Sequence, residues 1–182
     1  NNSGQAYETP DNVSALTAEL LAEGLIIGWF HWGAEFGPRA LGNRSILCQP
    51  YPEGQRDHIN ASVKFREEFR PFAPAVLAEY TKEYFQINQE SPHMLIACQV
   101  QPEKKERIPA VVHIDSSCRV QTVNESNNAL FYRLIKEFHK ITNCPVLLNT
   151  SFNVKGQPIV NSPKQAIDCF LSTNIDVLVV GD

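Results

Sequence analysis

A glycine-rich loop between two apolar segments holds the first residues whose types could do chemistry. Residues 35–45 read EFGPRALGNRS, which places two guanidinium groups, an amide and a hydroxyl close together, at Arg39, Asn43, Arg44 and Ser45. Glycines let backbone N–H groups approach an oxyanion, and a guanidinium group binds phosphate through paired hydrogen bonds. The loop therefore predicts a phosphate-binding site. The alternative is a surface turn whose arginines pair with neighbouring carboxylates.

A basic segment follows, in which cations alternate with bulky apolar residues. Residues 60–74 contain the cations Lys64, Arg66 and Arg70 among Val63, Phe65, Phe69 and Phe72. An extended backbone would place Lys64 and Arg66 on the face opposite Phe65, where both could reach one anion. The alternative is a solvated basic edge whose aromatic neighbours contact the core and whose charge two adjacent glutamates partly neutralise.

A third polar group follows an apolar strand near the C-terminus. The strand-like segment from Pro145 ends in Asn149, Ser151 and Asn153. Small donors and acceptors of this kind occur where the edge of a sheet meets a ligand. The alternative is a turn that its own Asn and Ser side chains satisfy.

A fourth candidate pair is His113 and Asp115, in a segment that continues to Arg119 and Gln121. Alternation along a strand would aim His113 and Asp115 to one side, where they could contact a ligand. The alternative is a structural role in which both side chains are hydrogen-bonded inside the protein.

The markers of several common enzyme classes are missing from the sequence. It contains no G-x-x-x-x-G-K-[ST] loop, no G-x-S-x-G elbow, no H-E-x-x-H pair and no strand-linked G-x-G-x-x-G. With no candidate nucleophile or general base, we expect chemistry by positioning and by electrostatic stabilisation of bound anions.

Length and charge narrow the classes further. A chain of 182 residues suits one globular domain. Its net charge of -4 and pI near 5.7 make nucleic acid and acidic membranes unlikely partners. The sequence has no apolar run of about 20 residues and no signal-like start. We therefore predict a cytoplasmic protein with no membrane partner.

The cysteines predict neither a disulfide framework nor a metal site. There are five, scattered along the chain without a C-x-x-C pair. We expect them to be reduced, small apolar residues.

The elements that must position these residues alternate along the chain. Apolar spacing and caps predict helices at residues 13–23, 55–62, from about 81, 127–142 and 163–172. Shorter apolar runs predict strands at residues 25–30, 45–48, 72–77, 93–100, 145–149 and 176–180. This order, without an internal repeat, predicts an α/β or α+β sheet covered by helices.

Three of these segments together resemble a known family. Residues 35–45, 63–74 and 145–156, in this order, are similar to the signature of the carbamoyltransferase C-terminal domain, found in nodulation-type and antibiotic O-carbamoyltransferases. The resemblance implies a YrdC-like fold, a twisted mixed sheet flanked by helices. It also implies that an N-terminal, actin-like ATPase-type domain is absent. The polar start, which runs straight into a helix and a strand, predicts that residues 1–10 are a flexible linker remnant.

The resemblance implies a function as well. In this family the domain is thought to join carbamoyl phosphate and ATP into a carbamoyl-adenylate, and the metal-binding N-terminal domain passes the carbamoyl group to an acceptor hydroxyl. Mg²⁺ would arrive with ATP as part of the substrate, so we expect no metal held tightly here.

Residue roles are hypotheses built on this resemblance. The expected catalytic residues are Arg39, Lys64, Arg66 and Arg70, whose charges would offset phosphate repulsion. The expected substrate- and nucleotide-binding residues are Arg44, Asn43, Ser45, Asn149, Ser151, Asn153, His113 and Asp115. Two alternatives stay open: a YrdC-like nucleotide- or RNA-binding module, and an interaction half that is inactive without its N-terminal domain.

Overall fold

The computed structural model describes residues 6–31, 33–64 and 72–181, and for Lys64 it describes the backbone alone. Two predicted catalytic cations, Arg66 and Arg70, therefore lie outside the described residues. So do the Lys64 side chain and residues 1–5 of the predicted linker.

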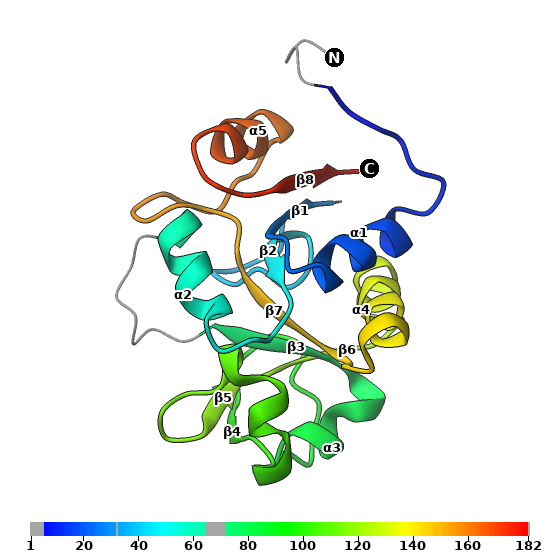
Figure 1. The fold of residues 1–182 in the computed structure, drawn as a ribbon, viewed down its shortest axis with the longest axis vertical. Coiled ribbons are helices and arrows are strands. Elements are labelled where there is room, and N and C mark those ends of the chain that lie inside the picture. The colour runs from blue at the N-terminus through cyan, green and yellow to red at the C-terminus, as the bar shows by residue number, and fades with distance from the viewer. Residues whose placement is uncertain (1–5, 32, 65–71, 182) are drawn as a thin grey trace.

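A six-stranded mixed sheet forms the centre of the fold (Figure 1). In spatial order its strands are β6 (Gln121–Val123), β3 (Ala73–Leu77), β7 (Val146–Ser151), β2 (Arg44–Cys48), β1 (Ile27–Phe30) and β8 (Val177–Val180). The outer pairs β3–β6 and β1–β8 are parallel, and the pairings between β3, β7, β2 and β1 are antiparallel. Every residue of β1, β2 and β3 is buried, as expected for strands covered on both faces.

Helices pack against this sheet. Helices α1 (Val13–Ala22) and α4 (Ala129–Thr142) lie side by side in Figure 1. The α4 helix buries an apolar stripe at the spacing that the sequence predicts, formed by Phe131, Leu134, Ile135 and Phe138. The side chain of Asn128 caps its first turn by accepting from the N–H of Phe131.

A second group of helices includes α2 (Gln55–Ile59) and α5 (Pro163–Leu171). The sheet strands β2 and β7 lie between α2 and α4 in Figure 1. The N–H of Asn174, after α5, donates to the carbonyl of Ser62, after α2, at 3.1 Å, so the ends of these two helices meet. The predicted mixed sheet with flanking helices is confirmed.

A small second sheet lies at the lower end of Figure 1. It pairs β4 (Ala97–Gln99) with β5 (Ser117–Arg119), next to the short helix α3 (Thr81–Tyr84) and the 3₁₀ turn η2 (Ala78–Tyr80). Two further 3₁₀ helices connect the strands, η3 (Pro102–Arg107) and η4 (Pro109–Val111).

The predicted strand through His113 and Asp115 is wrong. Both residues lie in a turn before β5, in which the N–H of Ser116 donates to the His113 carbonyl at 2.9 Å. Ser116 has a φ of 67°, so the chain reverses here and cannot alternate as a strand does.

The extended backbone expected around Lys64 is also wrong. Residues Asn60–Lys64 form a π-helical turn, η1, that continues α2. The turn keeps Val63 on the face of Ile59, four residues earlier, and both side chains are fully buried. Burial of this apolar pair therefore holds the segment in a helical form.

Among the described helices, none is both long and apolar enough to cross a membrane.

Candidate functional site

A single carboxylate shapes the loop between β1 and β2. Oε1 of Glu35 accepts hydrogen bonds from the N–H groups of Leu41 at 2.7 Å, Asn43 at 2.7 Å and Arg44 at 3.3 Å. Glu35 is therefore an internal anion that takes three of the amides of this glycine-rich loop, and these three are not available to an external anion.

Gly42 is required where the loop meets α4. Its φ is 109°, and a Cβ added there would stand 2.4 Å from Cδ1 of Phe131. Its carbonyl accepts from Nε1 of Trp29 at 2.9 Å, and its N–H donates to Oγ of Ser45 at 3.1 Å. Ser45 is fully buried. The predicted substrate-binding hydroxyl of Ser45 therefore anchors the loop.

Arg44 lies inside the protein, where it joins the two ends of the loop. Its side chain is 4% exposed, and Nη1 donates to the carbonyls of His31 at 2.5 Å and Asn43 at 3.1 Å. Its guanidinium carbon stands 3.5 Å from the centroid of the Phe30 ring. Burial lowers the pKa of Arg44, and the charge of Glu35 opposes this effect.

Asn43 connects the loop to the start of α4. Its Nδ2 donates to the Gly33 carbonyl at 3.0 Å, and its Oδ1 accepts from Nδ2 of Asn128 at 3.0 Å. Since Asn128 caps α4, the predicted binding amide of Asn43 holds the loop and this helix together.

Two amides fix the loop over the sheet. Nδ2 of Asn149, on β7, donates to Oε1 of Gln121 at 2.8 Å and to the Ala40 carbonyl at 3.2 Å, while Nε2 of Gln121, on β6, donates to the Leu41 carbonyl at 2.8 Å. The strand between them, β3, places Ala73 beside Asn149 and an alanine beside Gln121. Because alanine ends at a methyl group, the two amides meet across β3.

Asn149 keeps one unused acceptor. The side chain is 1% exposed, and its Oδ1 is buried with no hydrogen-bond partner among the described residues. A buried carbonyl oxygen without a donor is costly. The Nδ2 of the same amide donates to the carbonyl of Ala40, next in sequence to Arg39.

Two arginines converge beside this amide pair. Burial lowers the pKa of Arg119, on β5, and the nearby charge of Arg39 lowers it further. Within the described parts of the chain, neither guanidinium forms an ion pair with a carboxylate, and Nε of Arg39 is buried without a hydrogen-bond partner. Like charges brought together without a counter-ion favour an anionic ligand.

His113 and Asp115 border the arginine pair. Burial lowers the pKa of His113; the charge of Asp115 raises it and the charge of Arg119 lowers it. Asp115 is exposed, and its Oδ1 accepts from the hydroxyl of Ser117 at 2.7 Å and from its N–H at 2.9 Å, which lowers the pKa of Asp115. Asp115 therefore stabilises the turn through Ser117, and the positive charge of Arg119 acts on His113.

Ser151 and Asn153 form a turn after β7. Oγ of Ser151 donates to Oδ1 of Asn153 at 2.9 Å, and Nδ2 of Asn153 donates to the Gln157 carbonyl at 2.8 Å. In the sheet, Ser151 stands opposite Ser45. These bonds support the alternative that the sequence left open, a turn satisfied by its own side chains.

The structure thus divides the predicted residues. It brings Arg39, His113 and Asn149 to one region and uses Asn43, Arg44 and Ser45 to build the loop. The sequence-based site omitted Glu35, Arg119 and Gln121. The available signal for Arg119 and Gln121 was their place as polar residues within an otherwise apolar, strand-like stretch.

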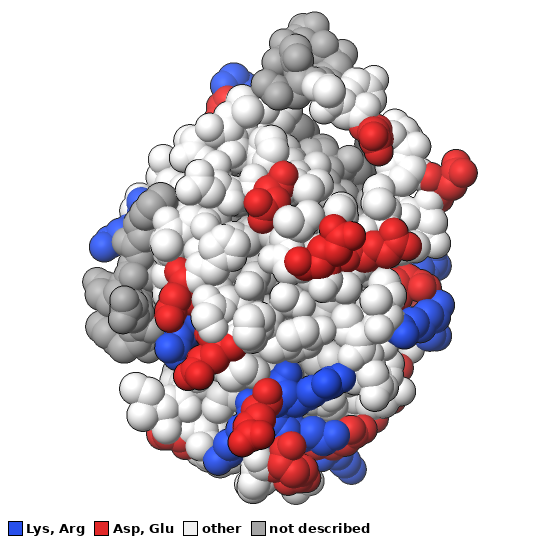
Figure 2. All heavy atoms as spheres, in the orientation of Figure 1, with Lys and Arg blue, Asp and Glu red and all other residues white. Residues whose placement is uncertain are grey.

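Two cavities lie away from these residues. One, of about 400 Å³, is lined by Tyr80, Glu83, Tyr84, Glu103, Lys104, Arg107, His139, Asn143 and Pro145. The other, of about 500 Å³, is lined by Tyr51, Pro52, Glu53, Glu106, Arg107 and Pro109. Figure 2 shows that lysines and arginines gather with acidic residues at the lower end of the visible face.

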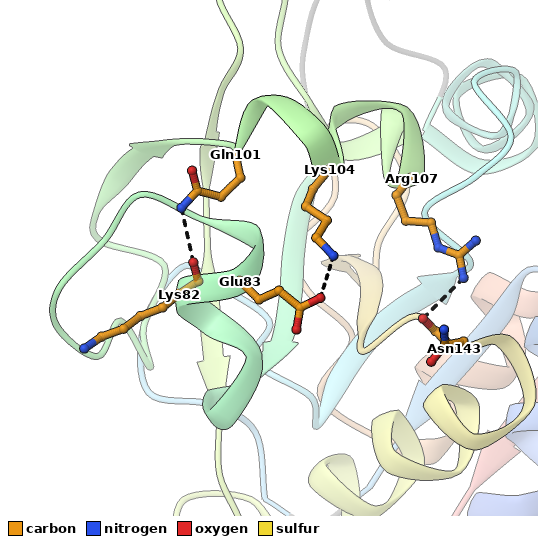
Figure 3. A network of polar contacts seen from close by, with 6 residues as sticks. All are labelled: Lys82, Glu83, Gln101, Lys104, Arg107 and Asn143. Carbon is orange, nitrogen blue, oxygen red and sulfur yellow. Dashed lines mark hydrogen bonds and ion pairs between the residues drawn. The ribbon is translucent and has the colours of Figure 1, made fainter.

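The first cavity contains one ion pair and a cation that contacts backbone carbonyls. Nζ of Lys104 pairs with Oε1 of Glu83 at 2.5 Å, and Arg107 donates to the carbonyls of Thr142 at 2.7 Å and Asn143 at 3.2 Å (Figure 3). A cation at the carboxyl end of α4 also complements the helix dipole. Lys104 of this cavity therefore has a carboxylate partner, which Arg39 and Arg119 lack among the described residues.

The chain is similar in sequence to a family of known proteins. The sequence profile described as "Carbamoyltransferase C-terminus" matches residues 18–182. Nodulation protein NolNO of Sinorhizobium fredii is 47% identical over 96% of this chain and 26% of its own length. The 3'-hydroxymethylcephem-O-carbamoyltransferase of Streptomyces clavuligerus is 38% identical over 92% of this chain and 32% of its own length.

Solved structures show the same fold. Full-length HypF in its phosphate- and nucleotide-bound form matches with a TM-score of 0.69 at 18% identity, over 93% of this chain and 25% of that one. P. abyssi Sua5 complexed with L-threonine matches with a TM-score of 0.67 at 12% identity, over 96% of this chain and 48% of that one. The predicted YrdC-like fold is confirmed; at these identities the likeness speaks for the fold alone.

Proposed function

Because this chain belongs to the carbamoyltransferase C-terminal family, we propose that it binds carbamoyl phosphate and ATP and forms carbamoyl-adenylate. The carbamoyl group ends on the α-phosphate of the nucleotide, one water is consumed, and phosphate and pyrophosphate leave. Mg²⁺ enters with ATP as part of the substrate. No covalent enzyme intermediate is required.

The observation that carries this proposal is the convergence of Arg39 and Arg119 without a carboxylate partner among the described residues. Bringing two phosphorylated substrates together needs fixed positive charge to offset their repulsion. A bound phosphate would also relieve the repulsion between the two guanidinium groups.

The surrounding framework supports the same assignment. Glu35 and Arg44 hold the loop from within, so Arg39 projects from a preorganised backbone. The amide of Asn149 donates to the carbonyl of Ala40, next in sequence to Arg39, and its Oδ1 has no partner among the described residues. A carbamoyl group carries an N–H donor close to its phosphate, which suits this combination of acceptor and cations.

Transfer to an acceptor would need more than this chain. It spans about a quarter to a third of the length of the curated relatives it matches. We propose that the acceptor hydroxyl binds to another part of the longer protein, the N-terminal domain that the family resemblance implies. Acceptor specificity would then lie outside these residues.

Calorimetric titration with carbamoyl phosphate, and separately with ATP and Mg²⁺, tests the proposal. Arg39→Ala should weaken carbamoyl phosphate binding by about 10- to 100-fold, since a hydrogen bond to a charged group contributes roughly 1.5–3 kcal/mol. Arg133→Ala, on the exposed face of α4, is the matched control and should bind as the unchanged chain does. A folded Arg39→Ala protein with unchanged affinity would contradict this site. Salt-dependent binding of tRNA with no affinity for carbamoyl phosphate would favour the RNA-binding alternative.

A further inference from the structure

Two cysteines that are distant in the sequence face each other in the small sheet. The register of β4 and β5 pairs Cys98 directly with Cys118, and their sulfur atoms stand 3.8 Å apart. Directly opposed residues of an antiparallel pair have Cα atoms about 4.5–5.5 Å apart. This lies within the range of about 4.4–6.8 Å between Cα atoms that a disulfide spans, so the pairing of the strands brings the two cysteines close enough for a bond.

Access to the two sulfurs is unequal. Cys98 is partly exposed on a strand whose neighbours Ala97 and Gln99 are exposed, whereas Cys118 is 1% exposed. A dissolved oxidant can therefore reach Cys98 first, and Cys118 is placed to react second from the protein side.

The thiol contact itself favours this order. The interaction with Cys118 lowers the pKa of Cys98, although burial opposes the effect, and the pKa of Cys118 is raised by the same contact and by burial. The more accessible sulfur is thus also the one that ionises more readily, and thiolate is the reactive form.

The remaining cysteines differ from this pair. Cys48, Cys144 and Cys169 are buried, and burial raises the pKa of Cys48 and raises that of Cys144 to about 11. The sulfur atoms of Cys98 and Cys118, in contrast, contact each other. Selective oxidation is therefore expected at the β4–β5 pair.

We propose that Cys98 and Cys118 form a reversible redox pair that small-molecule disulfides oxidise. The Cys98 thiolate attacks one sulfur of the small disulfide, which forms a mixed disulfide and expels one small thiolate. Cys118 loses its proton, attacks the sulfur of Cys98 and expels the second small thiolate. The protein loses two electrons and two protons, and the small disulfide gains them as two thiols.

The modification lies directly beside the candidate anion site. Arg119 follows Cys118 in β5, and its partner in the register is Ala97, next to Cys98. A disulfide would link the two strands one residue before this arginine. The proposal concerns oxidation of the pair, and it holds whether or not the neighbouring arginines bind carbamoyl phosphate.

The test uses the reduced, unmodified chain and glutathione disulfide as the probe. Intact mass should fall by about 2 Da as the pair closes, and two of the five thiols should become unreactive. Peptide mapping should join the segments that contain Cys98 and Cys118, and dithiothreitol should restore all thiols. Retention of all five thiols at oxidant concentrations that oxidise a model dithiol would overturn the proposal, as would a disulfide between other cysteines.

Single replacements separate the two roles. Cys118→Ser should stop at a glutathione adduct on Cys98, and Cys98→Ser should lose the rapid reaction. Cys169→Ser, outside the small sheet, is the control and should still lose two thiols. Should Cys118→Ser not fold, the peptide map of the unmodified chain decides the question by itself.

Discussion

The β1–β2 loop and the cavity beside η3 both concentrate polar side chains, but they use them differently. In the loop, Glu35 and Arg44 bind backbone groups inside the fold, and the adjoining arginines are left without a carboxylate partner among the described residues. At the cavity, Lys104 and Glu83 neutralise each other with side chains 24% and 49% exposed. Arginines without a carboxylate partner on a fixed backbone therefore indicate an anion-binding site better than an enclosed cavity does.

The largest expected effect tests how rigidly the loop is fixed. Gly42→Ala should lower the free energy of unfolding by about 3–5 kcal/mol, because the new methyl group meets Phe131 at a φ of 109° that alanine disfavours. Urea denaturation measures the change. The matched control is Gly54→Ala, at a φ of -64° with no atom within 4 Å of the added methyl, which should change stability little. Equal stability of the two variants would contradict the tight contact between the loop and α4.

Replacing one carboxylate in each region compares how much the two carboxylates contribute to stability. Glu35→Ala should cost about 2–4 kcal/mol of unfolding free energy, because it removes the acceptor of three loop N–H groups. Glu83→Ala should cost less than about 1 kcal/mol, because it breaks an ion pair that solvent screens. Thermal and urea unfolding of both variants give the comparison. A larger loss of unfolding free energy for Glu83→Ala than for Glu35→Ala would show that the cavity ion pair stabilises the fold more than the loop carboxylate does.

One histidine in each region makes the unfolding free energy depend on pH. Burial lowers the pKa of both His113 and His139, so below about pH 6.5 the unfolded chain binds protons that the folded chain does not. Their contribution to stability is therefore present above this pH and decreases as the pH falls through it. His113→Gln and His139→Gln should each flatten the dependence of unfolding free energy on pH below about 6.5. An unchanged slope in both variants would assign the acid sensitivity to other groups.

The smallest expected effect is a change in the pKa of a histidine when phosphate binds, and it distinguishes the Arg39–Arg119 pair from the cavity. Inorganic phosphate bound at Arg39 and Arg119 should raise the pKa of His113, because it offsets the charge of Arg119. His139, whose neighbouring charges are Glu79 and Glu83, should not respond. Imidazole resonances followed by NMR across pH, with and without phosphate, measure both. A shift confined to His139 would move the anion site to the cavity.

Much of the candidate site could be expected from local sequence. The glycine-rich loop, its arginines and the polar end of β7 were all predicted, because residue type and short spacing specify them. Their individual roles could not be. The acceptor geometry of Glu35 depends on a loop that folds back over nine residues, and Arg119 meets Arg39 only after the small sheet has packed beside β3.

The family, most of the helices and strands, and the buried stripe of α4 could be predicted from the sequence alone, since these depend on local propensity, periodicity and residue identity, whereas β5 and β6 were not predicted. Four features follow only from packing between segments: the turn at His113, the π-helical turn that ends at Lys64, the amide pair across β3 and the contact of Cys98 with Cys118. Each depends on strand register or on packing between distant segments. A pairwise contact of this kind carries no signal in the spacing of either segment alone.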